Sequence, residues 1–277
     1  MKKNLFTAFA LTALCTAAST SLSAQRGWEV GGWLGTAHYF GDLNTSFNFM
    51  HPGLALGAVG RFNFNDRLCA KMSLNYGNIG ADDANSKNEF EKNRNLSFKS
   101  PIFDGTAQFE FNFLPYNHGS REEFFTPYLF AGFSIYYSNP QAKLDDKWYA
   151  LRSMGTEGQF RGDEYYSSQG ALAYGGGVKV DITPIWSLNI ELSNRRLYSD
   201  YLDDVSTVYA NKNDLLKLRG PIAVALSDRS LPVDEKIINQ TGRQRGNGKD
   251  NDSYLFLQIG LVRYFGNLRC PGFGGRK

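Results

Sequence analysis

The sequence has few of the residues from which catalytic and metal sites are usually built. It contains three histidines and three cysteines in 277 residues, and no Cys or His pair stands at the spacing of zinc ligands. A hydrolase would need a base oriented beside a nucleophile, and His38 with a loop serine is the arrangement to consider. A lone histidine is more often a polar surface group. We therefore predict no catalytic residue, no metal and no cofactor.

The chain also lacks a long apolar run outside its first residues. The segment LFTAFALTALCTAA follows two lysines and precedes small residues, which predicts a signal peptide over residues 1–24. Cleavage after Ala24 fits best, and Ser23 is the alternative. Leu14 disfavours Cys15 as a lipid attachment site. No later stretch approaches the roughly 18 apolar residues of a membrane-spanning helix.

The chain also lacks a large excess of basic or of acidic residues. Removal of the signal peptide takes two of the 30 basic residues and none of the 27 acidic ones, which leaves a nearly neutral chain. A nucleic-acid partner usually leaves a basic footprint, so this class of partner is disfavoured.

What the chain has in abundance is apolar and polar residues that alternate with a period of two. In residues 103–113, Phe, Gly and Ala alternate with Asp, Thr, Gln, Glu and Asn. Such alternation is typical of a strand with one apolar face. The runs are 28–40, 54–64, 68–77, 103–113, 128–137, 171–181, 186–195 and 254–265. We therefore predict eight antiparallel strands.

The connections between these runs alternate in length. Asn65-Asp66, residues 114–125 and Thr183-Pro184 make short turns, whereas the other connections are long. Short turns at one end and long loops at the other are typical of an outer-membrane barrel. Lipid offers nothing to pair an edge strand, so such a sheet must close. We predict an all-β, eight-stranded antiparallel transmembrane β-barrel over residues 25–265, located in the outer membrane with both termini in the periplasm.

The second face of the strands predicts a filled interior. An eight-stranded barrel has just enough room for side chains, and pores generally need more strands. The charged residues expected to point inward are Arg61, Lys71, Asp104, Glu110, Lys179, Asp181, Glu191 and Arg195. Opposite charges among them favour a salt-linked core over a small pore. The long connection 203–252 contains NDLLKLRG and PIAVALSDR, which we expect to form helical turns that cap the barrel.

Acidic and aromatic residues follow the seventh run, in DYLDDVSTVY. Asp200, Asp203 and Asp204 come where this strand would leave the membrane, so we expect them to stay hydrated and to bond loop backbone groups. Tyr201 suits the membrane interface. Calcium, which takes several oxygen ligands, is the alternative, but the full spacing of a calcium loop is missing. We interpret these four residues as a structural rim.

Several segments together resemble the PorG family, small outer-membrane barrels of the type IX secretion system of Bacteroidota. They are GWEVGGWLGTAHYFGDLN, DYLDDVSTVY, GRQRGN leading into KDNDSYLFLQIGLVRYF, and the tail LRCPGFG. The resemblance implies a non-enzymatic component that links the outer membrane to a periplasmic ring, made by the lipoprotein PorK and its partner PorN. A stand-alone barrel with a structural or adhesive role is the alternative.

The tail 266–277 is the candidate partner-binding segment, through Arg269, Cys270 and Phe273. Because an even number of strands returns the chain to the side on which it began, we expect the tail to lie in the periplasm, an oxidising compartment in which disulfides persist. Three states of Cys270 stay open: a disulfide with Cys69, a disulfide with a ring lipoprotein, and a free thiol. Cys69 is expected to point into the barrel, close to the Asn65-Asp66 turn.

Overall fold

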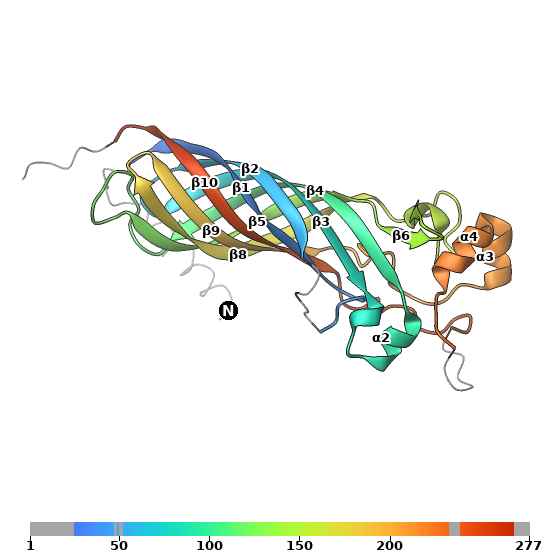
Figure 1. The fold of residues 1–277 in the computed structure, drawn as a ribbon. Coiled ribbons are helices and arrows are strands. Elements are labelled where there is room, and N and C mark those ends of the chain that lie inside the picture. The colour runs from blue at the N-terminus through green and yellow to red at the C-terminus, as the bar shows by residue number, and fades with distance from the viewer. Residues whose placement is uncertain (1–24, 47–48, 50–51, 233–238, 269–277) are drawn as a thin grey trace, which may run out of the picture.

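The computed structural model describes residues 25–46, 49, 52–232 and 239–268. Its main body is a closed barrel of eight antiparallel strands (Figure 1). Around the barrel the order is β3, β2, β1, β10, β9, β8, β5, β4, and pairing of β4 with β3 closes the ring. The barrel strands are β1 (Gly27–Phe40), β2 (Gly53–Asn63), β3 (Leu68–Asp82), β4 (Ser97–Asn112), β5 (Phe125–Ser138), β8 (Ser168–Thr183), β9 (Trp186–Leu197) and β10 (Ser253–Gly266).

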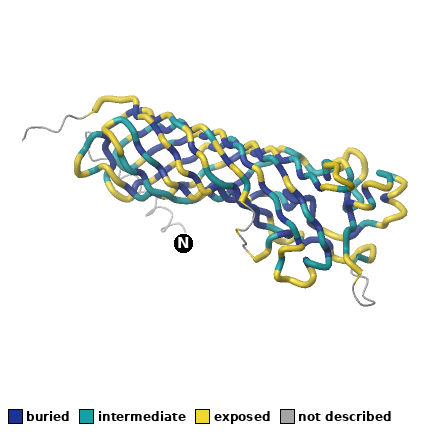
Figure 2. The backbone as a smooth tube through the Cα atoms, in the orientation of Figure 1, coloured by how far each residue is buried: buried dark blue, intermediate teal, exposed yellow. Residues whose placement is uncertain are grey.

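The predicted eight-stranded barrel is confirmed, and burial alternates along its strands as the sequence does (Figure 2). Outward-facing apolar side chains such as Leu54, Met72 and Phe109 are about two-thirds exposed or more. Polar side chains at the intervening positions are buried inside. This arrangement inverts a soluble barrel and suits a surrounding of lipid, in which an apolar outer belt is stabilised.

Local chemistry fixes the short turns. Asn65 accepts hydrogen bonds through Oδ1 from the backbone N–H of Arg67 and of Leu68, at 2.8 and 2.7 Å, which closes the turn between β2 and β3. Thr183 accepts through Oγ1 from the N–H of Trp186 at 3.0 Å in the turn between β8 and β9. These two turns lie where the sequence predicts them. We call this end of the barrel the short-turn end.

Four strands, β3, β4, β5 and β8, are at least four residues longer than predicted. In β3 and β4 the alternation continues past the outer apolar belt, with apolar residues such as Ile79 and Phe98 buried on the inner face. β3 and β4 pair as far as Asp82 and Ser97, so their hairpin projects beyond the other strands (Figure 1). A further hairpin, β6 (Gln141–Leu144) and β7 (Lys147–Ala150), joins β4 by one pairing of Lys99 with Gln141. The sequence analysis predicts neither feature.

The long connections fold together over the other end of the barrel, and we call the described residues of 41–46, 83–96, 139–167 and 198–252 the loop cap. Its helices are η1 (Asp83–Asn85), α2 (Glu89–Arg94), η2 (Arg152–Met154), α3 (Lys212–Arg219) and α4 (Pro221–Ser227). The last two confirm the helical turns expected between residues 203 and 252. Within the described parts of the chain, no helix is long and apolar enough to cross a membrane.

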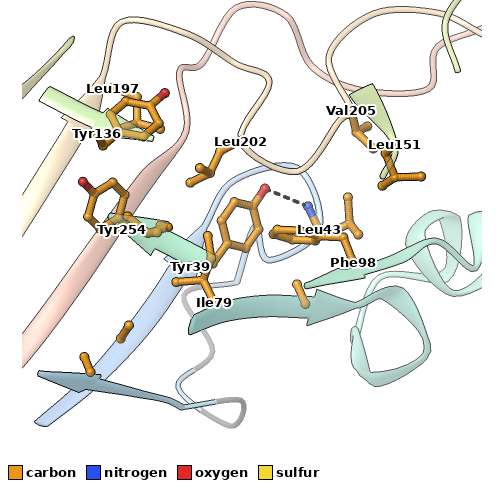
Figure 3. Packing of buried hydrophobic residues seen from close by; sticks show 14 of the residues in the cluster. Tyr39, Leu43, Ile79, Phe98, Tyr136, Leu151, Leu197, Leu202, Val205 and Tyr254 are labelled. Carbon is orange, nitrogen blue, oxygen red and sulfur yellow. Dashed lines mark hydrogen bonds between the residues drawn. The ribbon is translucent and has the colours of Figure 1, made fainter. Parts of the chain in front are cut away.

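The buried apolar cluster sits where the barrel meets the loop cap. Figure 3 shows Tyr39 and Phe98 from the strands close to Leu43 and Leu202 from the cap, with Val205 beside Leu151. Burial of large apolar side chains at this junction stabilises the cap on the barrel. The loop cap is therefore a folded extension of the barrel that shares an apolar core with the ends of the strands.

Candidate functional site

The inside of the barrel nearest the short-turn end holds a buried ion network around Glu110. Lys179 Nζ lies 2.7 Å from Glu110 Oε2, and Lys71 Nζ lies 3.4 Å from Oε1. Arg61 Nε lies 2.8 Å from Glu110 Oε2, an ion pair without hydrogen-bond alignment, while its Nη1 donates to Glu29 at 2.5 Å. Each of these side chains is at most 5% exposed. A buried charge of this kind is tolerated because it is paired.

A second network is centred on Asp104, toward the loop cap. Its Oδ2 accepts from Arg195 Nε at 3.0 Å and from Tyr254 OH at 2.6 Å, and its Oδ1 accepts from Asn75 Nδ2 at 2.6 Å. Thr106 and Ser134 donate to the same carboxylate at 2.6 Å each. With five donors, this carboxylate is fully satisfied inside the barrel.

The two networks leave almost no open space between them. A void of about 20 Å³ lies at the level of Trp33, Ser73 and Gln258, which is room for about one water molecule. The predicted inward residues all face the interior, and Asp181, the last of them, has a side chain 5% exposed. The filled barrel is therefore as predicted, and the residues that the structure describes leave no continuous passage for a solute through it.

The short-turn end is closed by residues 113–124, which we call the plug turn. The sequence predicts a short turn at residues 114–125, but it does not reveal that Tyr116, Asn117 and His118 are buried. His118 Nε2 lies 3.1 Å from Glu29 Oε1, and its Nδ1 lies 3.1 Å from Asp181 Oδ1. Burial opposes a charge on His118, but the bonds to both carboxylates outweigh it and raise the pKa to about 9. His118 is therefore an imidazolium that seals the end of the barrel.

Both described chain ends meet beside the plug turn, as strand parity predicts. Gln25 donates through Nε2 to the carbonyl oxygens of His118 at 3.2 Å and of Asn267 at 3.0 Å. Tyr264 stacks on the His118 ring at a centroid distance of 4.2 Å. The last strand is thus tied to the plug just before the tail begins.

The structure places one of the two cysteines of the predicted disulfide. Cys69 points into the barrel as expected, is 1% exposed, and lies 3.8 Å from Lys179 Nζ and 3.7 Å from Asn112 Nδ2. The signal peptide 1–24 and the tail residues Arg269, Cys270 and Phe273 lie outside the described residues. The pairing of Cys270 stays a prediction.

The DYLDD segment lies at the exit of β9, as predicted, but the expectation that its carboxylates stay hydrated is wrong. Asp203 and Asp204 are each 1% exposed, and Asp200 is 8% exposed. Asp203 accepts from Tyr39 OH at 2.5 Å, and Asp204 accepts from Tyr165 OH at 2.9 Å. The physical reason is cover by loops distant in sequence, which a local pattern does not reveal.

Tyr201 lies in the loop cap, half-buried. Its ring stacks on Tyr165 with centroids 4.9 Å apart and an angle of 9° between the rings, and its hydroxyl donates to Glu157 at 3.3 Å. Glu157 also accepts from Arg245 Nη1 at 3.0 Å. The rim residues therefore join the loops to one another.

The buried carboxyl groups of this acidic cluster outnumber the positive charges that lie beside them. Desolvation raises the pKa of Asp200 to about 8 and that of Asp204 to about 6, and it raises the pKa of Asp203 and of Asp252 as well. Carboxylic acids that hold their protons avoid the cost of buried, unpaired charge. Of the residues that the structure describes, no group of three or more His, Cys, Asp or Glu side chains is arranged to hold a metal ion.

Two arginines that the sequence analysis does not single out hold the cap together. Arg94 bonds both oxygens of Asp83 at 2.8 Å and donates to the carbonyl oxygen of Asp42 at 2.7 Å. Arg245 donates to the carbonyl oxygen of Asp204 at 2.6 Å, and its own carbonyl accepts from Arg94 at 2.7 Å. Arg245 belongs to GRQRGN, Asp42 to GDLN and Asp204 to DYLDD. Three segments far apart in the chain thus converge at one place.

His38 does not belong to a catalytic arrangement in the described structure. Its Nε2 lies 3.0 Å from Thr36 Oγ1, and its ring meets Phe49 edge-on at 5.0 Å between centroids. A nucleophile, a base and an orienting group would have to share hydrogen bonds. Thr36 supplies a hydroxyl, but no carboxylate among the described residues is bonded to the other ring nitrogen of His38.

Comparison with known proteins adds a family and a set of similar folds. The model of a family described as "Domain of unknown function (DUF6089)" matches residues 3–220. No protein with a curated description matches the sequence.

Among solved structures, the chain is similar to several small outer-membrane proteins. Neisserial surface protein A has 11% identity and a TM-score of 0.42, over 86% of this chain and 97% of that chain. OprG of Pseudomonas aeruginosa has 11% identity and a TM-score of 0.42, over 88% and 98%. Ail, the attachment invasion locus protein of Yersinia pestis, has 10% identity and a TM-score of 0.41, over 88% and 100%.

Proposed function

The chain belongs to the DUF6089 family, whose description assigns no activity, and we propose that it is a non-catalytic outer-membrane component of the type IX protein secretion machinery. In this role it links a periplasmic ring, of the PorK and PorN type, to the outer membrane. Cargo passes through another component.

The filled barrel is the observation that carries this proposal. Networks around Glu110 and Asp104 occupy the interior, and His118 seals one end. A barrel without a passage is suited to anchoring rather than to conduction. The sequence resemblance to the PorG family indicates the machinery to which such an anchor would belong.

The orientation follows from the lengths of the connections. In outer-membrane barrels short turns face the periplasm and long loops face outward. The short-turn end then faces the periplasm, and with it the chain end that continues from Leu268 into the tail. The ring would be bound on this side, through Arg269, Cys270 and Phe273.

The surroundings of Cys69 favour an intermolecular disulfide of Cys270 over the intrachain pairing. Cys69 is 1% exposed and packs against Lys179 and Asn112, beneath a mouth that the plug turn closes. A bond to it would require the tail to enter this filled space, because disulfide geometry brings the two Cα atoms within about 7 Å. We propose that Cys270 bonds to a ring lipoprotein.

Co-purification tests the proposal. The full chain is extracted gently from outer membranes, and its partners are compared on reducing and non-reducing gels with those of Cys270→Ser. Cys69→Ser is the matched control, because it removes the other mature cysteine. We expect periplasmic lipoproteins to co-purify, with a high-mass band that disappears on reduction and in Cys270→Ser but persists in Cys69→Ser.

Two results would count against it. Recovery of the barrel alone, from membranes in which other secretion complexes stay intact, would contradict the ring role. Partners that co-purify without the reducible band would leave the ring role standing and exclude the covalent link.

A stand-alone barrel with a structural or adhesive role is the second candidate. The observation that favours it is the loop cap, a folded surface on which Phe160 and Tyr166 are 63% and 80% exposed. Aromatic side chains are enriched in protein–protein interfaces. Deletion of the tail separates the two functions, since only a ring component would lose periplasmic partners while its barrel still assembles.

A further inference from the structure

A groove of about 640 Å³ lies between the β6–β7 hairpin, the projecting part of β3 and β4, and the start of β2. Its size is within the range of small-molecule sites, about 300–1,000 Å³. The lining residues include Asn78, Asp82, Lys143, Asp145, Trp148 and Arg229. The groove is separate from the barrel interior and from the DYLDD cluster.

Trp148 gives the groove an aromatic wall with a cation beside its ring. The residue is 46% exposed, and Lys99 Nζ lies 3.7 Å from its ring centroid. Lys99 does not line the groove, so this ammonium group covers the ring without filling the site. A cation over an aromatic face is attractive and restrains the ring. Trp148 is thus a prepared stacking platform.

Polar groups of both signs surround this platform. Lys143 Nζ lies 2.6 Å from Asp146 Oδ1, and Arg229 Nη1 donates to Ser97 Oγ at 3.1 Å. With Asp82 and Asp145 the lining carries nearly balanced charge, which does not favour a polyanion. Carboxylates accept and basic groups donate hydrogen bonds, so the groove suits an uncharged ligand rich in hydroxyl groups.

The turn of the β6–β7 hairpin keeps its carboxylates at a conformational cost. Asp145 and Asp146 have φ angles of 47° and 62°, in the left-handed region. Two-residue turns of this kind favour Asn-Gly or Asp-Gly, because glycine has no Cβ to strain. The turn thus places two carboxylates at the edge of the groove.

The groove begins where the apolar belt of the barrel ends. Gly53 and Asn78 line it, and the adjacent Leu54 is 67% exposed on the outer surface of the barrel. With the orientation of the proposed function, on which this step rests, the site lies at the height of the sugars of outer-leaflet glycolipids. A ligand anchored in the membrane would present its saccharide at this position.

From these observations we propose that the groove binds the saccharide part of an outer-leaflet glycolipid, with one sugar ring stacked on Trp148 and its hydroxyl groups bonded to Asp145, Asp146 and Arg229. The groove is already present in the structure, so binding requires no rearrangement of the barrel strands. It is independent of the tail, so its failure and the failure of the ring role are distinguishable.

Calorimetric titration of the purified full-length barrel tests this. The probe is the neutral fraction, separated by anion exchange, of the oligosaccharides released by acid from the glycolipids of the host bacterium, free of acyl chains. We expect saturable binding to the unmodified protein, weaker by about tenfold or more in Trp148→Ala and partly restored in Trp148→Phe. Phe160→Ala, which removes an exposed aromatic of the loop cap outside the groove, is the matched control and should bind normally.

Asp145→Asn is the second variant, because asparagine tolerates the left-handed backbone and removes only the charge. It should weaken binding even if Trp148→Ala fails to assemble. No binding to the unmodified protein, or binding by Trp148→Ala and by Asp145→Asn that is as tight as that of the unmodified protein, would overturn the proposal. Binding of intact glycolipid alone, with no difference between the variants, would assign the contact to acyl chains on the belt and would overturn it too.

Discussion

Removal of the carboxylate at the centre of the barrel network should cost much of the stability of the protein. Glu110 contacts Lys179 and Arg61 at 2.7 and 2.8 Å and Lys71 at 3.4 Å, and all four side chains are at most 5% exposed. Loss of one partner of a buried ion pair costs about 3–5 kcal/mol, because the other charge stays buried without compensation. We expect Glu110→Gln to lower the free energy of unfolding by this amount.

The assay is urea-induced unfolding from lipid vesicles, followed by tryptophan fluorescence and by the band shift on unheated gels. Glu89→Gln is the matched control: its ion pair with Lys92, at 2.9 Å, is solvent-exposed, and such a pair contributes about 0–1 kcal/mol. The double variant Glu110→Gln/Lys179→Met restores charge balance and should recover part of the loss. Equal small effects of Glu110→Gln and Glu89→Gln would refute the view that buried charge organises the barrel.

Three further results are expected. Burial raises the pKa of Asp200 to about 8, so the stability linked to its proton is full below about pH 4 and is lost as pH rises through 8. Asp200→Asn should therefore make the loop cap more protease-resistant at pH 9. An unchanged digestion profile would contradict this. The raised pKa of His118 gives stability that is full below about pH 6.5 and lost as pH rises through 9, so trypsin should cut at Arg121 faster above pH 9 and, in His118→Gln, already at pH 7. A Cβ at Gly35 would lie 1.9 Å from a backbone oxygen of β10, whereas one at Gly60 meets nothing within 4 Å, so Gly35→Ala should reduce barrel assembly on unheated gels and Gly60→Ala should not.

The eight strands could be predicted because each one carries its own signal. Lipid on one side and a packed polar interior on the other impose a period of two on every strand, as in residues 103–113, where Asp104 and Glu110 are buried between exposed phenylalanines. The inward direction of Cys69 follows from the same alternation.

The plug, and the contacts that hold the loop cap together, could not be predicted in this way. His118 is recognisable as a plug only beside Glu29 and Asp181, and Arg94 matters through Arg245, which is 151 residues away in the chain. Contacts of such separation leave no local pattern. The same reason explains the error over hydration: the composition of DYLDD is typical of a surface, and its burial comes from loops elsewhere in the sequence.

The measurement that tests the central claim most directly is site-specific photo-crosslinking in intact cells. A photoreactive residue is placed at Phe273 in the tail or at Phe160 in the loop cap, and crosslinked products are identified by mass spectrometry. The account predicts crosslinks from Phe273 to a periplasmic ring lipoprotein and none to it from Phe160. Crosslinks from Phe160 alone, with none from Phe273, would contradict the ring role and support a stand-alone barrel that acts through its outer loops.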